Sequence, residues 1–230
     1  MSRRDEIEAG LTRVRERIAA ACADVDRSAE EVRLVVVTKF FPASDVRILA
    51  GLGVTDVGEN RHQEAEAKAA ECADLGLTWH FIGGLQSNKA AAVASYADVV
   101  ESVDRRKLVA PLGRGAGERV VDVLLQVSLD PPGRAGRAGA DAADLDELAG
   151  AVEGTDGLAL RGLMAVAPLG EDPAEAFARL AAIRAPFLER HPGAGWLSAG
   201  MSADLEQAIG AGATHVRVGS AVLGSRPSNN

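Results

Sequence analysis

The chain has 230 residues, of which 47% are hydrophobic and 25% charged, and its formal net charge is −8. This composition is typical of a folded globular protein, and the acidic balance argues against a nucleic-acid partner. No run approaches the roughly 20 apolar residues that span a bilayer, and the charged N-terminus does not resemble a secretion signal, so we expect a cytoplasmic protein with no membrane partner.

The N-terminal segment predicts a long helix over about residues 3–25, because its apolar residues recur every three or four positions: Ile7, Leu11, Val14 and Ile18. Ser2 and Asp5 resemble a capping box at its start. Cys22 and Cys72 fall in helical patterns without a paired-cysteine motif, so we expect buried or free thiols and no disulfide.

After this helix, strand-like runs alternate with helix-like runs. Strands are predicted at Arg33–Lys39, Val54–Val57, Thr78–Ile82, Asp98–Val103, Val120–Ser128, Leu158–Val166, Gly195–Ser198 and Thr214–Val218. Helices are predicted at Asn60–Ala73, Ser87–Ser95, Asp141–Val152, Pro173–Leu188 and Ser202–Ile209. Eight such units with one extra helix in front predict a single closed (β/α)8 barrel, an α/β fold of typically about 250 residues. A doubly wound open sheet is the alternative, but the first strand lacks a Gly-rich dinucleotide fingerprint.

The chain shows no linker between domains, so we expect residues 1–230 to form one domain. The stretch Pro131–Ala140 is rich in glycine, proline and arginine. Its composition and place predict a flexible loop after the fifth strand and not a domain boundary.

Lys39 ends the first predicted strand, directly before a helix-start signal at 42–45. The carboxyl ends of the strands carry the ligands in barrels of this kind. Burial lowers the pKa of a lysine, and the neutral amine can form a Schiff base with an aldehyde. The alternative is a lysine whose apolar stem simply reaches from the strand end into water.

The last two predicted strands end in segments rich in glycine and serine. Gly200 and Gly219 permit a close approach of the backbone, while the hydroxyls of Ser198, Ser202 and Ser220 can donate hydrogen bonds. Phosphate sites in barrels commonly form from the loops after strands seven and eight. Ordinary helix capping by Ser202 and Ser220 is the alternative.

Arg217 lies inside the eighth predicted strand, where an unpaired guanidinium would be costly to bury. A salt bridge to Glu59 or Asp104 could satisfy it, and so could an aromatic ring nitrogen or a carboxylate of a ligand. A strand-end Lys39, a phosphate cradle and an arginine that faces the barrel top together describe a site for pyridoxal 5'-phosphate (PLP).

The chain resembles the pyridoxal phosphate homeostasis proteins of the YggS/PROSC type over nearly its whole length. The blocks that carry the resemblance are Val37–Lys39, Gly58–Asn60 with Gln63 and Glu64, Trp79–Gly83, Leu85–Lys89, Ser102–Arg105, Arg161–Ala165, Leu197–Ser198, Gly200–Ser202 with Asp204, and Val216–Ser220. The resemblance implies a barrel like the N-terminal domain of alanine racemase, with PLP on Lys39, Asn60 beside the ring and Arg217 at the pyridine nitrogen. It also implies five residues around the phosphate: Ser198, Gly200, Met201, Gly219 and Ser220.

Several positions depart from the family pattern: Gly84, Ala167, Ala199 and Leu223. The loop after the fifth strand also lacks the lysine that is frequent there in the family, and it offers only Arg134 or Arg137. The resemblance therefore does not carry a second-lysine role in cofactor handling over to this chain.

The same residues bear on whether bound PLP would react further. An arginine does not release its proton, so a pyridine nitrogen that accepts from Arg217 stays unprotonated and the ring is a poor electron sink. Racemisation would still need a second acid or base, and we expect His80 to be a packed core residue, while the only tyrosine, Tyr96, ends a helical pattern.

We therefore expect a non-catalytic monomer of vitamin B6 homeostasis that holds PLP as a Schiff base on Lys39 and exchanges it with other proteins, such as PLP-dependent apo-enzymes. A weak amino-acid racemase is one alternative. A phosphate-binding barrel without pyridoxal, such as a sugar-phosphate isomerase, is another.

Overall fold

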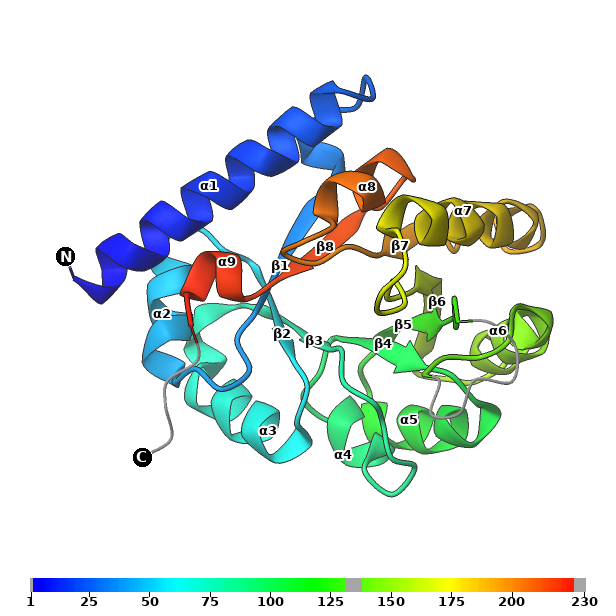
Figure 1. Cartoon of the computed structure of the whole chain (residues 1–230). Helices are drawn as coiled ribbons and strands as arrows, with labels where there is room; N and C mark the ends of the chain where they lie inside the picture. The colour runs from blue at the N-terminus through cyan, green and yellow to red at the C-terminus, as the bar shows by residue number, and fades with distance from the viewer. Residues whose placement is uncertain (1, 131–137, 226–230) are drawn as a thin grey trace.

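The structure is a computed structural model that describes residues 2–130 and 138–225 (Figure 1). Its parallel strands pair in chain order and close into a barrel, with β8 beside β1. The strands are β1 (Arg33–Val37), β2 (Asp56–Glu59), β3 (Thr78–Phe81), β4 (Val99–Val103), β5 (Val121–Gln126), β6 (Leu158–Met164), β7 (Trp196–Ser198) and β8 (His215–Val218). The predicted closed barrel is confirmed, and the open-sheet alternative is wrong. Residues 131–137 of the predicted loop, with Arg134 and Arg137, lie outside the described residues.

Helices surround the barrel on its outer side (Figure 1). They are α1 (Arg3–Ala23), α2 (Ala43–Gly51), α3 (His62–Glu71), α4 (Ala90–Ala94), α5 (Val109–Ala116), α6 (Leu145–Glu153), α7 (Pro173–Arg190), α8 (Leu205–Gly210) and α9 (Ser220–Leu223). Short 3-10 turns are η1 (Ala29–Glu31), η2 (Ala73–Leu75), η3 (Arg106–Leu108) and η4 (Ala142–Asp144). The predicted helix over 141–152 is divided into η4 and α6, and the one over 202–209 begins only at Leu205.

The extra N-terminal helix α1 begins with the predicted capping box. The Ser2 hydroxyl accepts from the Asp5 N–H at 3.2 Å, and the Ser2 N–H donates to the Asp5 carboxylate at 2.8 Å. The apolar stripe of α1 is buried against the barrel, which is why a helix with so many charges docks there. Cys22 and Cys72 are both buried free thiols, as predicted, and burial raises the pKa of each.

Helix α1 also packs on α9, so the two ends of the described chain lie side by side (Figure 1). Gly10 allows this approach, because a Cβ at this position would lie 2.4 Å from the Val222 carbonyl oxygen. The Arg3 guanidinium donates to the Asp45 carboxylate at 2.6 Å and to the Leu223 carbonyl at 3.0 Å. The first helix therefore braces the last one.

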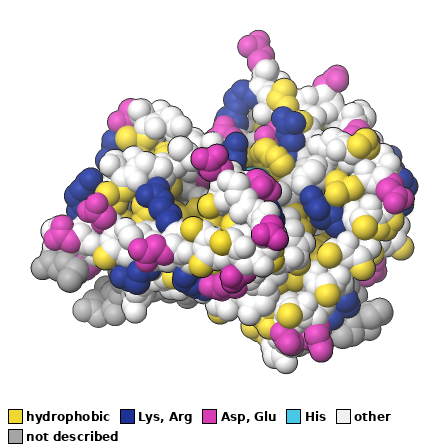
Figure 2. All heavy atoms as spheres, turned by 90° about the horizontal axis from the view of Figure 1, so that it is seen from above, with side chains coloured by type: hydrophobic (Ala, Val, Ile, Leu, Met, Phe, Trp, Pro, Cys, Tyr) yellow, Lys and Arg dark blue, Asp and Glu magenta, His cyan; other side chains and the backbone are white. Residues whose placement is uncertain are grey.

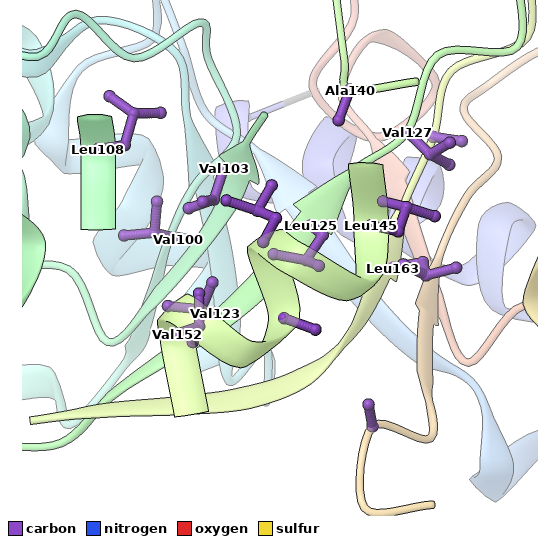
Figure 3. Close-up of a cluster of buried hydrophobic side chains, with 14 of the residues drawn as sticks. Val100, Val103, Leu108, Val123, Leu125, Val127, Ala140, Leu145, Val152 and Leu163 are labelled. Atoms are coloured by element: carbon purple, nitrogen blue, oxygen red, sulfur yellow. The ribbon is translucent and has the colours of Figure 1, made fainter. Parts of the chain in front are cut away.

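Alternate residues of the strands face the helices and the barrel interior, except where a register shift between Val100 and Val103 interrupts the alternation in β4. Figure 3 shows one of the two large apolar clusters between the sheet and the helices, with Val100, Val103, Val123, Leu125 and Leu163 from the strands and Leu108, Leu145 and Val152 from outside them. A smaller apolar cluster, Val99, Leu124 and Met164, is separate from both. The strands also bury charged side chains, among them Asp56, His80, Glu101 and Arg217, and these shape the site described next.

The outer surface carries both signs of charge. Lysine and arginine side chains are interspersed with aspartate and glutamate over the face seen in Figure 2. Among the described residues, no helix combines the length and the apolar character that crossing a membrane requires.

Candidate functional site

A cavity of about 420 Å³ opens at the carboxyl ends of the strands. Six of the eight predicted cofactor-binding residues line it: Lys39, Asn60, Met201, Arg217, Gly219 and Ser220. Its walls are mainly apolar and include Val37, Phe41, Ile82 and Met164. A mainly apolar pocket with a few convergent polar groups is the usual form of a small-molecule site, for which about 300–1,000 Å³ is typical.

Two of the predicted binding residues do not line this cavity. Ser198 is fully buried, and its hydroxyl donates to Glu101 Oε2 at 2.5 Å while it accepts from Arg217 Nη1 at 2.5 Å. Gly200 has φ +91°, and a Cβ there would lie 2.6 Å from the Ala208 Cβ. Ser198 thus fixes Arg217, and Gly200 makes room for α8, so both act on the cavity from behind its wall.

The serines at the cavity rim are not helix caps. Helix α8 begins after Asp204, whose Oδ1 accepts from the Met201 N–H at 2.6 Å, and α9 begins after Gly219. Neither helix has a side-chain cap, so the capping alternative for Ser202 and Ser220 is wrong. Both serines line the cavity.

Arg217 is held by partners that the sequence analysis did not predict. Its guanidinium donates to Ser198 Oγ and, through Nη2, to the Ala165 carbonyl at 2.9 Å, and Nη1 lies 3.7 Å from Glu101 Oε2. The alternative of a salt bridge to Glu59 or Asp104 is wrong, because Glu59 pairs with Lys68 and Asp104 pairs with Arg105. Burial lowers the pKa of Arg217, and the nearby Glu101 carboxylate opposes this shift.

The partners of Arg217 belong to a connected group of charged and polar side chains inside the barrel, which we call the axial network: Asp56, His80, Glu101, Ser198 and Arg217. Glu101 Oε1 lies 2.7 Å from His80 Nδ1, and His80 Nε2 lies 3.1 Å from Asp56 Oδ1. Burial lowers the pKa of His80, but its hydrogen bonds to Asp56 and Glu101 outweigh burial and raise the pKa to about 9. Burial raises the pKa of Glu101, but His80, Arg217 and Ser198 outweigh it and lower the pKa to about 2. His80 is therefore a buried residue, as predicted, but a charged one.

A second group of polar and charged side chains lies beside Lys39, and we call it the flanking cluster: Thr38, Glu59, Glu64 and Lys68. All of them are buried except Glu64, which is partly exposed. Lys68 Nζ donates to Glu59 Oε1 at 2.6 Å, to Glu64 Oε1 at 3.0 Å and to the Thr38 carbonyl at 2.9 Å. The Thr38 hydroxyl donates to Glu59 Oε1 at 2.6 Å. Burial raises the pKa of Glu59 although Lys68 lowers it, and Glu59 Oε2 has no hydrogen-bond partner among the described residues.

Asn60 reaches the cavity because β2 and β3 end close together. Gly83 permits this approach, since a Cβ there would lie 2.1 Å from the Asn60 carbonyl oxygen. The Asn60 side-chain Oδ1 is buried and has no hydrogen-bond partner within the described part of the chain. An amide buried in this way at a cavity wall is a natural contact for a polar ligand.

The roles of Glu101, Phe40, Glu64 and Lys68 were not predicted from the sequence. Glu101 could have been found, because it alternates with outward-facing Val100 and so belongs inside the barrel. Glu64 stood in a block of the family resemblance but carried no assigned role. Phe40 gave no signal, although its backbone conformation proves unusual.

The chain is similar to a protein-family model and to curated proteins over nearly its whole length. The family model for the N-terminal domain of alanine racemase matches residues 12–227. A curated protein of Mycobacterium bovis, named pyridoxal phosphate homeostasis protein, is 43% identical over 246 residues, which cover 97% of this chain and 94% of that protein. A protein of the same name from Escherichia coli K12 is 39% identical over 230 residues, which cover 96% and 97%.

A solved structure is also similar to this chain in both fold and sequence. The structure of PipY from Synechococcus elongatus PCC7942, described as having PLP bound, has a TM-score of 0.77 and 39% identity. The match covers 90% of this chain and all of that one. The chain therefore belongs to the alanine racemase N-terminal domain family and, within it, to the pyridoxal phosphate homeostasis proteins.

Proposed function

We propose that this chain binds PLP covalently through Lys39 and acts in vitamin B6 homeostasis as a cofactor-holding protein without catalysis of its own. The observation that carries the proposal is the cavity that unites Lys39, Asn60 and Arg217 with the rim at Gly219 and Ser220. The relatives named for PLP homeostasis and the PipY structure with PLP support it.

The residues at this cavity fit the chemical groups of PLP. When bound, PLP supplies an aldehyde that condenses with a lysine amine, and Lys39 would provide that amine. Asn60 offers a buried amide atom without a partner, and Arg217 offers a cation to the ring nitrogen. At the phosphate end, Gly219 lacks a Cβ, and the hydroxyls of Ser202 and Ser220 are donors.

The lining favours holding over catalysis. Among the described residues that line the cavity there is no aspartate, glutamate, histidine, tyrosine or cysteine to act as a second acid or base. His80 lies between Asp56 and Glu101, and Tyr96 stacks on His62 with ring centroids 5.9 Å apart, so neither residue supplies the missing group. This supports the holding function over the racemase alternative.

The test of the proposal is to titrate the protein with PLP and then reduce it with borohydride. The chain has only four lysines, so peptide mass mapping assigns the added mass without ambiguity. We expect a visible absorption band and a reduced adduct on Lys39, both lost in Lys39→Ala and kept in Lys107→Ala, whose lysine is exposed. A band that survives Lys39→Ala would contradict the proposal, and no band in the wild type would favour the phosphate-barrel alternative.

A second measurement separates holding from racemisation. The PLP-loaded protein is incubated with L-amino acids in deuterium oxide. We expect no Lys39-dependent entry of deuterium at Cα on a turnover timescale. Entry that disappears in Lys39→Ala would overturn the non-catalytic holding function, and formation of the D-amino acid beside it would identify the racemase alternative.

We further propose that residues 1–230 act as one cytoplasmic, monomeric domain that passes PLP to PLP-dependent apo-enzymes. Light scattering tests the monomer. Transfer is tested by mixing the PLP-loaded protein with an apo-enzyme in the presence of a scavenger of free PLP. Activation faster than scavenging allows from free PLP would support direct transfer, and equal rates would contradict it.

A further inference from the structure

The turn that carries Lys39 has an unfavourable backbone conformation. Phe40, the next residue, has φ +71°, in the left-handed region that a residue with a bulky side chain rarely adopts. Conformations of this kind persist only where surrounding interactions hold them, and they concentrate at ligand sites.

A backbone hydrogen bond from the Phe41 N–H to the Thr38 carbonyl at 3.0 Å closes this turn, and further interactions that hold it come from outside the cavity. The Phe40 N–H donates to Glu64 Oε1 at 2.6 Å. On the other side of Lys39, the Thr38 carbonyl accepts from Lys68 Nζ, which also bonds the same Glu64 oxygen. The flanking cluster thus fixes the residue before Lys39 and the residue after it, and Glu64, Lys68 and Glu59 do not line the cavity.

We propose that Glu64 is a positioning residue for Lys39. Its carboxylate holds Phe40 in the left-handed conformation, and this directs the Lys39 side chain into the cavity. Lys68 in turn fixes the Glu64 carboxylate, since the two side chains lie one helical turn apart on α3 with an N–O distance of 3.0 Å. The inference rests on the proposed function of Lys39 and adds a device that prepares this lysine before the cofactor arrives.

A Lys39 turn that is already in its binding conformation strengthens the binding of PLP. A hydrogen bond to a carboxylate is about twice as strong as a neutral one, so Glu64 is suited to keep a strained residue in place. Without it, Phe40 can relax to a negative φ, and only the fraction of molecules with the original turn would bind PLP productively. The dissociation constant would rise by the inverse of that fraction.

The first experiment compares Glu64→Ala, Glu64→Gln and Glu71→Ala. Glu71→Ala is the matched control, because Glu71 is an exposed glutamate of the same helix. We expect Glu64→Ala to raise the dissociation constant for PLP about tenfold or more and to slow formation of the Lys39 adduct, as loss of a charge-assisted hydrogen bond predicts. Glu64→Gln keeps an acceptor oxygen and should recover most of the affinity, and Glu71→Ala should match the wild type.

A second experiment needs no cofactor. Hydrogen exchange of the apo-protein reports the amide of residue 40, and competitive acetylation reports the reactivity of Lys39. In Glu64→Ala we expect faster exchange at Phe40 and a changed acetylation rate at Lys39, with Lys107 unchanged as the internal reference.

A double-mutant cycle with Phe40→Gly tests the strain itself. Glycine adopts φ +71° without a steric penalty, so in the Phe40→Gly background the loss of Glu64 should weaken PLP binding less than in the wild type. The loss of PLP affinity on Glu64→Ala is measured separately in the wild type and in Phe40→Gly. This is needed because Phe40 also lines the cavity, so Phe40→Gly can change the affinity by itself.

The outcomes separate this inference from the proposed function. A wild type that forms no Lys39 adduct overturns the function, while hydrogen exchange still reports whether Glu64 holds the turn. A wild type that forms the adduct, with unchanged affinity, adduct rate and Phe40 exchange in Glu64→Ala, overturns the inference. A lower melting temperature for Glu64→Ala with unchanged affinity well below that temperature also overturns it, because Glu64 would then be only structural.

Discussion

The axial network is buried, the flanking cluster is buried except for the partly exposed Glu64, and both hold a residue of the candidate site, yet their charges are arranged differently. In the axial network the charges alternate in sign from Asp56 through His80 and Glu101 to Arg217. In the flanking cluster two carboxylates, Glu59 and Glu64, share the one ammonium of Lys68. One arrangement is balanced, and the other has an excess negative charge.

The pKa values follow this difference. Glu101 has its pKa lowered to about 2 despite burial, while burial keeps the pKa of Glu59 raised. Glu59 therefore takes up a proton more readily than an ordinary glutamate, whereas Glu101, between two cations, takes one up less readily. The comparison indicates a fixed support for Arg217 on one side and a more adaptable support for the Lys39 turn on the other.

The largest effect is expected from Glu101→Gln, which breaks the axial network at its centre. His80 and Arg217 would lose the carboxylate between them, and removal of one partner of a buried ion pair typically costs about 3–5 kcal/mol. Urea unfolding of the apo-protein at neutral pH measures this loss. A loss below about 1 kcal/mol would show that the network is not the fixed support described above.

The pH dependence of stability tests whether the axial network keeps His80 protonated. The pKa of His80 in the folded protein, about 9, exceeds its ordinary value of 6.5, so its contribution is complete below pH 6.5 and is lost as the pH rises through 9. The groups that face His80 are Asp56, Glu101 and the ring of His215, 6.2 Å away. We expect the free energy of unfolding to fall between about pH 6.5 and 9 by up to about 1.4 kcal/mol per unit. The fall should vanish in His80→Gln and persist in Lys68→Met.

A smaller effect is expected from Lys68→Met, which breaks the flanking cluster. Glu59 would lose its cation, but it can take up a proton, so we expect a loss of about 1–3 kcal/mol at neutral pH. The loss should shrink toward pH 5, where Glu59 protonates more readily. Urea unfolding of wild type and variant at both pH values measures the difference. A loss equal to that of Glu101→Gln at both would remove the distinction between the two clusters.

The smallest effect is expected from Glu206→Gln, which provides a reference on the surface. Glu206 Oε1 accepts from Arg17 Nε at 2.7 Å, and both side chains are more than a third exposed. An exposed pair of this kind contributes about 0.2–1 kcal/mol. Thermal unfolding should therefore show little change, and a change as large as that of Lys68→Met would mean that exposure is no guide to these costs.

Much of the fold could be predicted from the sequence, because the signals were local. Each predicted strand is a short apolar run, and most of the observed strands end within two residues of the prediction. The strand ends also located Lys39 and Arg217 correctly at one cavity.

The partners of these residues were harder to predict, because they depend on which way each side chain faces. Glu59 follows Gly58, which faces the barrel interior, so Glu59 points to α3 and meets Lys68 instead of Arg217. Asp104 lies beyond the end of β4 and pairs with Arg105. The left-handed Phe40 was not predicted, since its conformation depends on a hydrogen bond to Glu64, which lies 24 residues away in the sequence.

The pairing of β8 with β1 has a consequence for the order of folding. The cavity takes Val37 and Lys39 from the end of β1 and Arg217 and Gly219 from the end of β8, so residues far apart in the sequence must meet before it exists. A chain in which β8 has not yet paired with β1 can hold helices and other strand pairs but has no finished pocket. Capture of the ligand must therefore follow closure of the barrel and cannot guide the earlier steps of folding.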